Sequence, residues 1–326
     1  MVRALWHHGV TAVCPTVITN AEEHMLAALR AIDRACADDP MIGASIPGIH
    51  VEGPHIATDD GPRGAHPLAH VRPPDLAEYR RWQEAAGGRI RIITLSPEYL
   101  EAVAYIEAIV ADGVIASIGH TAASTEQIRA AVDAGARWST HLGNGAHAML
   151  RRHPNYIWDQ LAEDRLMAGF IFDAHHLPPA VMQTMIRAKG IERSVLVSDA
   201  LHVAGLGPGE YTLPDGASVT LLPSGRLELT GTPFLAGCAT GLPTCVSNAV
   251  RYAGLSVAEA IRTVTTNPSK LLGLDALGWH DSLRIGARAN LTVFRQDPAD
   301  LLISIVTTVV DGTVVHGNVA GAVVAR

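Results

Sequence analysis

The sequence is poor in the residues that mark several large classes of protein. It has four cysteines (Cys14, Cys36, Cys238 and Cys245), and no two of them form a C-x-x-C pair. Neither a disulfide framework nor a thiolate zinc site is indicated, and we expect buried thiols. No apolar run approaches the roughly 18 residues that span a bilayer, and the start MVRALWHHG lacks a signal peptide's apolar stretch. We therefore expect a cytoplasmic protein with no membrane partner.

Positive charge is also scarce. Lysine and arginine number 25 against 32 aspartates and glutamates, and the formal net charge is −7. A nucleic-acid partner is disfavoured, because binding to a phosphate backbone requires a basic face. A small anionic substrate would have to be held by a few local cations. With 48% hydrophobic and 17% charged residues, the composition is typical of a compact globular protein.

The most regular feature of the sequence is an alternation of short β-branched runs, polar loops and Ala-rich stretches. This alternation predicts an α/β protein with a parallel sheet. The runs begin at Thr11, Ile46, Ile90, Val114, Arg137, Leu166 and Ser194. Helices are expected between them at residues 21–37, 75–85, 97–111, 124–134 and 178–189, several of which are opened by Ser, Asp or Pro.

The pattern changes after Asp199. The segments GEYTLPDGASVTL and SGRLELTG predict a β-hairpin excursion, followed by helices near residues 240–252 and 256–264. From Ile285 the tail reads as three short strands joined by Asp and Gly turns. We therefore expect a barrel domain over residues 1–280 and a small β-sandwich-like appendage over residues 281–326.

Polar residues stand where several apolar runs end, and in parallel barrels the active site lies at the carboxyl ends of the strands. These residues are Glu52 in HVEGP, His120 in SIGHT, His141 in STHLGN, His176 in DAHH and Asp199 in VSDA. Two neutral imidazoles and a carboxylate suit a cation such as zinc with one open position for water. A further aspartate nearby could serve as a general base.

Each of these residues also has a purely structural interpretation. A histidine at a strand end is more often a hydrogen-bonded structural residue than a ligand, Glu52 could cap a loop, and Asp199 could be the N-cap of a helix. The joint placement of three histidines, a glutamate and an aspartate at successive strand ends favours a metal site.

The same residues carry a resemblance to a known family. HVEGPHI followed by GAH, SIGHTAAS, THLGNGAH, DAHHLPP, LVSDA and TTNPSKLLGL resemble, in order, the motifs of the N-acetylglucosamine-6-phosphate deacetylases of the amidohydrolase superfamily. The resemblance extends over nearly the whole chain. It implies a (β/α)8-type TIM barrel, a divalent metal ion (zinc first, with iron, manganese or cobalt as alternatives) and a homodimer. The implied reaction releases acetate from an N-acetylhexosamine 6-phosphate.

The resemblance also implies roles for individual residues. The family's metal ligands match Glu52, His120 and His141, and its catalytic carboxylate matches Asp199. A histidine that stabilises the acyl oxygen matches His66. The implied substrate contacts are His176, Asn144, Gly145 and, for the phosphate, Arg152.

Two departures from the family pattern leave the substrate open. The family commonly reads His-Leu-Phe/Tyr-Asn-Ala-Met where this chain reads His-Leu-Gly-Asn-Gly-Ala from His141, so an aromatic residue and a methionine are missing from the pocket wall. Arg151 and Arg152 are adjacent, and either one could face the substrate or merely form a surface salt bridge. The alternatives are therefore an amidohydrolase for an unphosphorylated or cyclic amide, and an inactive barrel with a binding role.

The N-terminal segment also departs from the family. Family members begin with strands of a small β domain and a first barrel strand that, in two-metal members, carries a His-x-His pair. Here AVCPTVIT at residues 12–19 already matches the second strand, and Met1 falls inside the preceding helix. We therefore expect a barrel without its first strand, one metal ion rather than two, and sheet edges near residues 13–18 and 194–197 that another segment, a partner chain or water must cover.

Overall fold

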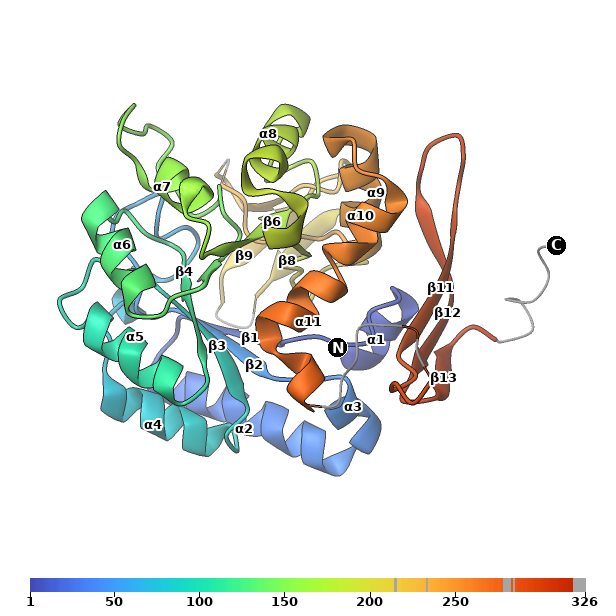
Figure 1. The fold of residues 1–326 in the computed structure, drawn as a ribbon, viewed down its shortest axis with the longest axis horizontal. Coiled ribbons are helices and arrows are strands. Elements are labelled where there is room, and N and C mark those ends of the chain that lie inside the picture. The colour runs from blue at the N-terminus through green and yellow to red at the C-terminus, as the bar shows by residue number, and fades with distance from the viewer. Residues whose placement is uncertain (214–215, 233, 278–282, 284, 319–326) are drawn as a thin grey trace.

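The structure, a computed structural model, describes residues 1–318 except 214–215, 233, 278–282 and 284. Its centre is a curled sheet of seven parallel strands in the order β1-β2-β3-β4-β5-β6-β7 (Figure 1). The strands are β1 (Thr16–Ile18), β2 (Ile49–Glu52), β3 (Ile90–Leu95), β4 (Ile115–Ile118), β5 (Trp138–Ser139), β6 (Met167–Ile171) and β7 (Ser194–Val197). The predicted α/β barrel class and all seven predicted runs are confirmed.

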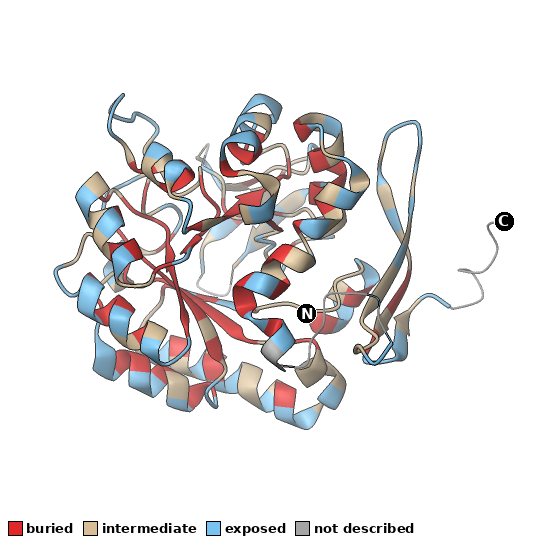
Figure 2. Ribbon diagram, in the orientation of Figure 1, coloured by how far each residue is buried: buried red, intermediate tan, exposed pale blue. Residues whose placement is uncertain are grey.

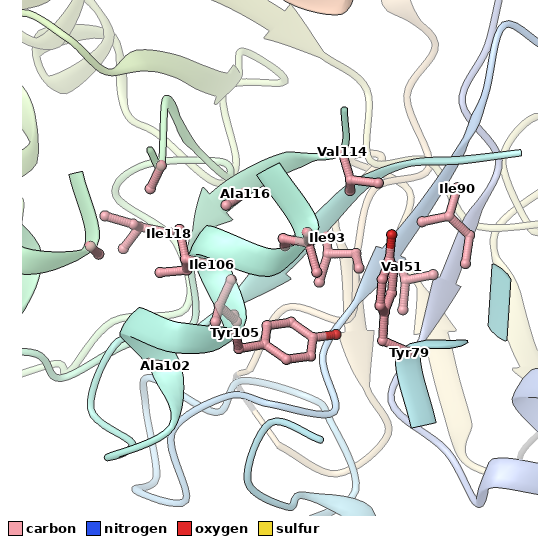
Figure 3. Packing of buried hydrophobic residues seen from close by; sticks show 14 of the residues in the cluster. Val51, Tyr79, Ile90, Ile93, Ala102, Tyr105, Ile106, Val114, Ala116 and Ile118 are labelled. Carbon is pink, nitrogen blue, oxygen red and sulfur yellow. The ribbon is translucent and has the colours of Figure 1, made fainter. Parts of the chain in front are cut away.

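Most of the strands are predominantly apolar, because helices and loops cover both faces of the inner part of the sheet. Every residue of β2 and β4 is buried (Figure 2). The largest core cluster joins these strands to the helices outside them, with Val51 and Ile93 packed near Tyr79 and Tyr105 (Figure 3). This rigid core positions the loops at the carboxyl ends of the strands, where the predicted site residues stand.

Helices surround the sheet as expected of such a barrel. They are α2 (Glu22–Asp38), α3 (Pro40–Ala44), α4 (Leu76–Ala85), α5 (Ala102–Ala111), α6 (Thr125–Asp133), α7 (Tyr156–Ala162), α8 (Pro179–Lys189), α9 (Leu242–Ala253), α10 (Val257–Arg262) and α11 (Thr266–Leu272), with 3-10 turns η1 (Leu68–His70), η2 (Ile191–Arg193) and η3 (Leu274–Leu277). The predicted helices are present, and α6 begins with a capping box formed by Ser124 and Gln127. The short helices α3, α7 and α11 were not predicted.

One predicted helix starts later than expected. The segment from residue 97 is a turn, and α5 begins only at Ala102. The carboxylate of Glu98 accepts hydrogen bonds from Thr121 Oγ1 at 3.3 Å and from the amide of Ala122 at 2.9 Å. Because these bonds tie Glu98 to the loop after β4, the turn precedes the helix.

The two edge strands of the sheet are not paired with each other or with an eighth strand among the described residues. On β1, Ile18 is 42% exposed. On β7, Ser194 and Leu196 are buried, and the Leu196 amide donates to the carbonyl of Thr263 at 3.1 Å. The prediction of a sheet with seven strands is confirmed. The segment at Thr263 covers the edge of β7, while side chains of β1 remain exposed.

Two antiparallel sheets follow the barrel strands. The excursion is three-stranded, with β8 (Gly209–Thr212), β9 (Ser218–Leu221) and β10 (Leu227–Leu229). The tail forms β11 (Leu291–Gln296), β12 (Ile303–Val310) and β13 (Thr313–His316), as predicted. The expected domain boundary after residue 280 lies outside the described residues.

The N-terminal residues are helical, as expected, and lie against the C-terminal sheet (Figure 1). Helix α1 (Val2–His7) is held there by Thr308, whose hydroxyl donates to the carbonyl of Trp6 at 2.7 Å. Thr292 donates in the same way to the carbonyl of Gly9 at 2.7 Å. Among the helices that the structure describes, none is both long and apolar enough to cross a bilayer.

Candidate metal centre and active site

Three buried side chains converge at the carboxyl end of the sheet. Glu52 is the last residue of β2, and His120 and His141 lie just after β4 and β5. Glu52 Oε1 lies 3.1 Å from His120 Nε2 and 2.8 Å from His141 Nε2, and the two Nε2 atoms are 3.1 Å apart. The sequence analysis predicted this set, and the fold brings it together from positions up to 89 residues apart.

Backbone strain accompanies these positions. His120 has a φ of 50°, His141 of 27° and Asp199, after β7, of 49°. Only a few per cent of residues other than glycine adopt a positive φ, although aspartate and histidine do so more often than most. Such conformations cost of order 1–3 kcal/mol per residue and cluster at functional sites. All three positions follow within two residues of the end of a barrel strand.

The carboxylate and one imidazole of this cluster shift each other's pKa. Burial disfavours the charged form of His141, but the hydrogen bond and negative charge of Glu52 outweigh it and raise the pKa of His141 to about 9. Burial likewise acts against the charged Glu52, but hydrogen bonds from His120 and His141 hold its pKa well below its ordinary value. Without a cation, a proton on His141 therefore balances the Glu52 charge.

The donor set fits a divalent cation. One carboxylate oxygen and two imidazole nitrogens lie within 4.8 Å of one another. Nε2 of His120 and Nε2 of His141 lie 3.1 Å apart and both face the same Glu52 oxygen. Lone pairs of two imidazoles and one carboxylate that face a common point suit a cation there. Two imidazoles, one carboxylate and an open position are the ligands of a catalytic zinc-type site.

A hydrogen bond on the far side of the His120 ring, away from Glu52, holds its orientation. Its Nδ1 donates to the carbonyl of Pro62 at 2.9 Å, which directs Nε2 toward the other two ligands. Gly145, with a φ of 54°, lies so close that a Cβ there would meet His120 Nδ1 at 2.7 Å. The structure thus places Gly145, predicted to contact the substrate, directly against His120, a candidate metal ligand.

Asp199 lies at the same end of the barrel. Its backbone carbonyl accepts from the Cys238 amide at 3.0 Å, and the residue is exposed to solvent. Desolvation by the surrounding protein and then the negative charge of Glu52 raise the pKa of Asp199 to about 6. A carboxyl that titrates this close to neutrality is suited to taking and returning a proton.

His66 approaches the cluster from the long loop after β2. Its ring packs edge-on against His120, with centroids 4.3 Å apart, and its Nδ1 lies 2.8 Å from Thr19 Oγ1. Burial, followed by the nearby imidazole charges, lowers the pKa of His66 to about 3, so the ring is neutral. The sequence analysis did not find Thr19, because it lies 47 residues away.

His176 is held by a neighbour in the same loop. Its Nδ1 donates to Asp173 Oδ2 at 2.7 Å, while the amides of His175 and His176 donate to Asp173 Oδ1 at 2.9 and 2.8 Å. Burial opposes ionisation of Asp173, yet the His176 hydrogen bond lowers the pKa of this carboxyl to about 2. The three-residue spacing in DAHH could have revealed this pair from the sequence.

The remaining predicted substrate residues lie on the loop between β5 and α7. Asn144 donates from Nδ2 to the carbonyl of His141 at 3.2 Å, beside the metal ligands. Arg151 and Arg152 lie farther along this loop, which projects from the rim of the barrel before α7 (Figure 1). Both side chains are exposed, and neither forms an ion pair within the described part of the chain. The structure thus places Asn144 and Gly145 at the site and leaves both arginines on an exposed loop.

A surface groove lies away from the candidate metal site, between α2 and α4. Its volume is about 380 Å³, and Arg30, Arg34 and Arg81 contribute to its walls. None of the predicted site residues lines it. It is therefore separate from the chemistry described above.

A parallel barrel with a carboxylate, two imidazoles and an adjacent aspartate at its strand ends defines a metal-dependent hydrolase of the α/β barrel class. Comparison with known proteins agrees. The model of the amidohydrolase family matches residues 1–324. The N-acetylglucosamine-6-phosphate deacetylase of Bos taurus is 34% identical over 90% of this chain and 71% of the relative.

Two further relatives extend the comparison. The N-acetylgalactosamine-6-phosphate deacetylase of Escherichia coli O157:H7 is 33% identical over 87% of this chain and 73% of its own length. A mutant N-acetyl-D-glucosamine-6-phosphate deacetylase from Mycobacterium smegmatis, solved with N-acetyl-D-glucosamine-6-phosphate, has a TM-score of 0.86 at 31% identity and matches 96% of this chain and 79% of that chain. The chain belongs to the amidohydrolase family, in the group of the N-acetylhexosamine-6-phosphate deacetylases. It is thus a hydrolase of carbon–nitrogen bonds in linear amides, which argues against an inactive barrel.

Proposed function

We propose that this protein hydrolyses the acetamide of an N-acetylhexosamine 6-phosphate and releases acetate and the free amino sugar phosphate. The observation that carries the proposal is the convergence of Glu52, His120 and His141 within 4.8 Å, with Asp199 at the same end of the barrel. Relatives that act on the gluco and the galacto sugar are about equally similar to this chain, at 34% and 33% identity. The proposal therefore leaves the configuration at the epimeric carbon open.

The metal ligands in this proposal are Glu52, His120 and His141, and zinc is the first choice of metal. A divalent cation held there supplies Lewis-acid chemistry, which polarises an acyl oxygen and makes water acidic enough to lose a proton near neutral pH. Glu52 supplies the negative charge that partly neutralises the cation. The Pro62 carbonyl keeps the His120 ring turned so that Nε2 faces inward.

Asp199 acts as base and then as acid in this proposal. Its carboxylate takes the proton from the attacking water as the acyl carbon becomes tetrahedral. The same proton then passes to the amine nitrogen as the carbon–nitrogen bond breaks, because an amine leaves more readily than an amide anion. The raised pKa of Asp199, about 6, matches both halves of the task.

His66 stabilises the developing negative charge on the acyl oxygen. Thr19 Oγ1 lies 2.8 Å from His66 Nδ1 and 3.4 Å from the carbonyl of Glu52. Thr19 has one hydroxyl proton for these two contacts. In the proposed tautomer it is donated to His66 Nδ1, the nearer of the two, rather than to the Glu52 carbonyl, so the His66 proton lies on Nε2 and can be donated to the acyl oxygen. Removal of such a donor typically costs about 3–4 kcal/mol of transition-state stabilisation.

His176, Asn144 and Arg152 position the sugar phosphate in this proposal. Asp173 holds the Nδ1 proton of His176, so Nε2 is the ring nitrogen left to accept from a sugar hydroxyl. The guanidinium of Arg152 is exposed and can reach a phosphate as two parallel hydrogen bonds. We also propose a homodimer in the cytoplasm.

A second candidate is hydrolysis of an unphosphorylated amide. The loop at Gly143 and Gly145 favours it, because it lacks large side chains, and both arginines beyond it are exposed. A substrate panel on zinc-reconstituted protein separates the two candidates. We expect the phosphorylated acetylhexosamines to have the highest kcat/KM, and equal rates for unphosphorylated sugars would favour the second candidate.

A further inference from the structure

A chain of hydrogen bonds crosses the interior of the barrel directly beneath the metal ligands. His50 Nε2 lies 2.7 Å from Thr94 Oγ1, Thr94 Oγ1 lies 2.6 Å from Thr140 Oγ1, and Thr140 Oγ1 lies 2.6 Å from Ser117 Oγ. Ser117 Oγ then donates to the carbonyl of Trp138 at 3.2 Å. The four side chains are buried. They come from β2, β3, β4 and the turn directly after β5.

Counting protons fixes the direction of this chain, because each hydroxyl has one proton to donate. The Trp138 carbonyl can only accept, so the Ser117 hydroxyl donates its one proton to it and must accept from Thr140. Thr140 then accepts from Thr94, and Thr94 accepts from His50. Satisfying all four contacts puts a proton on Nε2 of His50. Thr16 Oγ1, which lies 3.4 Å from His50 Nδ1 and 3.4 Å from the Cys14 carbonyl, must then donate to Nδ1.

Each of the three candidate metal ligands has a neighbour in the sequence that belongs to, or packs against, this series of hydrogen-bonded side chains. His50 precedes Glu52 by one intervening residue on β2, and Thr140 directly precedes His141. Gly119, next to His120, is so close that a Cβ there would meet Thr140 Cβ and Thr94 Cγ2, each at 2.8 Å. Thr94 and Thr140 therefore pack closely against the backbone next to His120, and Thr140 is also the residue bonded to His141.

We propose that the chain running from His50 through Thr94, Thr140 and Ser117 positions the three metal ligands, with Thr94 as its central positioning residue. Thr94 holds none of the ligands itself. It links the strand of Glu52 to the turns of His120 and His141, so that all three ligand positions share one buried, directional polar layer. Such layers favour a single arrangement, because a broken link leaves buried polar groups without partners. This inference rests on the metal site of the proposed function, but not on the substrate.

The test is zinc affinity, measured by competition with a chelating dye, in Thr94→Val. Valine keeps the shape of threonine and removes the hydroxyl. His50 Nε2 then loses the acceptor on Thr94, and Thr140 loses its donor and keeps only its contact with Ser117. We expect the dissociation constant for zinc to rise about 10- to 100-fold, the range typical of lost outer contacts around metal ligands. Thr94→Ser restores the hydroxyl and is expected to recover most of the affinity.

The matched control is Thr263→Val. Thr263 is also fully buried, and its hydroxyl donates to the carbonyl of Ala260 at 2.6 Å, away from the metal ligands. Its loss should lower the melting temperature while the zinc affinity stays within about twofold of the wild type. Equal zinc affinity in Thr94→Val and Thr263→Val would overturn the proposal.

A second measurement does not depend on any variant's folding or on the reaction. Long-range proton–nitrogen NMR correlations of the metal-free wild type should show the His50 proton on Nε2, in slow exchange with water. A proton confined to Nδ1 would contradict the derived direction of the chain. If the wild type binds no zinc at all, the proposed function fails, whereas wild-type zinc binding that is unchanged in Thr94→Val refutes the positioning role alone.

Discussion

Nε2 of His141 lies 2.8 Å from Oε1 of Glu52, nearer than Nε2 of His120 at 3.1 Å from the same oxygen. This contact, together with the Glu52 charge, raises the pKa of His141 to about 9 against the effect of burial. The metal-free site thus holds a proton at neutral pH, and a cation must displace it.

Zinc affinity is therefore expected to depend on pH. Below about pH 9 His141 is protonated in the metal-free protein, so binding one cation should release one proton, and affinity should rise roughly tenfold per pH unit. Competition titrations between pH 6 and 8 and proton release in a weakly buffered solution would measure this. A pH-independent dissociation constant would show that the Glu52–His141 pair does not hold the proton.

Asp199→Asn should abolish turnover while zinc still binds, because an amide keeps the shape of the carboxyl but cannot accept the proton from water. Rates of purified, zinc-loaded variant and wild type would be compared. A variant that retained a tenth of the wild-type rate would rule out Asp199 as the base.

The same substitution should stabilise the metal-free protein at neutral and higher pH. The pKa of Asp199 is raised from 3.8 to about 6 in the folded protein. The protonated carboxyl therefore contributes to the free energy of unfolding in full below pH 3.8, and this contribution is lost as the pH rises through 6. Asparagine does not ionise. The melting temperature of metal-free Asp199→Asn should therefore exceed that of the wild type at pH 7.5 and equal it near pH 3.8, by calorimetry.

His120→Ala and His141→Ala should each lose most of the bound metal, because a site with three protein ligands has little left to hold the cation after losing one. Elemental analysis of the purified variants should find less than about a tenth of the wild-type content. His24→Ala is the control, since His24 is exposed on α2 and its Nδ1 lies 3.2 Å from Asn20 Oδ1, outside the candidate metal site. Full metal content in both site variants would refute the ligand assignment.

Arg152→Ala should raise KM for a phosphorylated substrate about tenfold, because a charge-assisted hydrogen bond to an anion is worth roughly 1.5–3 kcal/mol. KM for the unphosphorylated sugar should change little. Arg151→Ala is the matched control on the same exposed loop. If Arg151→Ala shows the selective effect instead, the neighbouring arginine binds the phosphate.

Asp173→Asn should lower kcat/KM about 10- to 100-fold, as is common when the partner of a functional histidine is lost. The amides of His175 and His176 already occupy Oδ1 of Asp173, so the new NH2 group would face Nδ1 of His176 and reverse its tautomer. NMR of the His176 ring nitrogens would detect the reversal. An unchanged tautomer with unchanged kinetics would remove Asp173 from the mechanism.

Local patterns in the sequence were sufficient for much of the fold. Hydrophobic runs separated by Ala-rich stretches predicted all seven barrel strands. Inner strands such as β2 are buried on both faces and are therefore apolar almost throughout. The short helices α3, α7 and α11 escaped prediction because segments of five to seven residues show too little periodicity.

The candidate metal ligands were also readable in the sequence, since Glu52, His120 and His141 each end or follow an apolar run and parallel strands end at one edge of the sheet. Only the tertiary structure decided what surrounds them. Thr19 meets His66 across 47 residues, Pro62 meets His120 across 58, and Thr94 meets Thr140 across 46. Hydroxyls and carbonyls of this kind occur throughout any sequence, and their partners are set by how the strands curl and which loops fold over them, which no local pattern records.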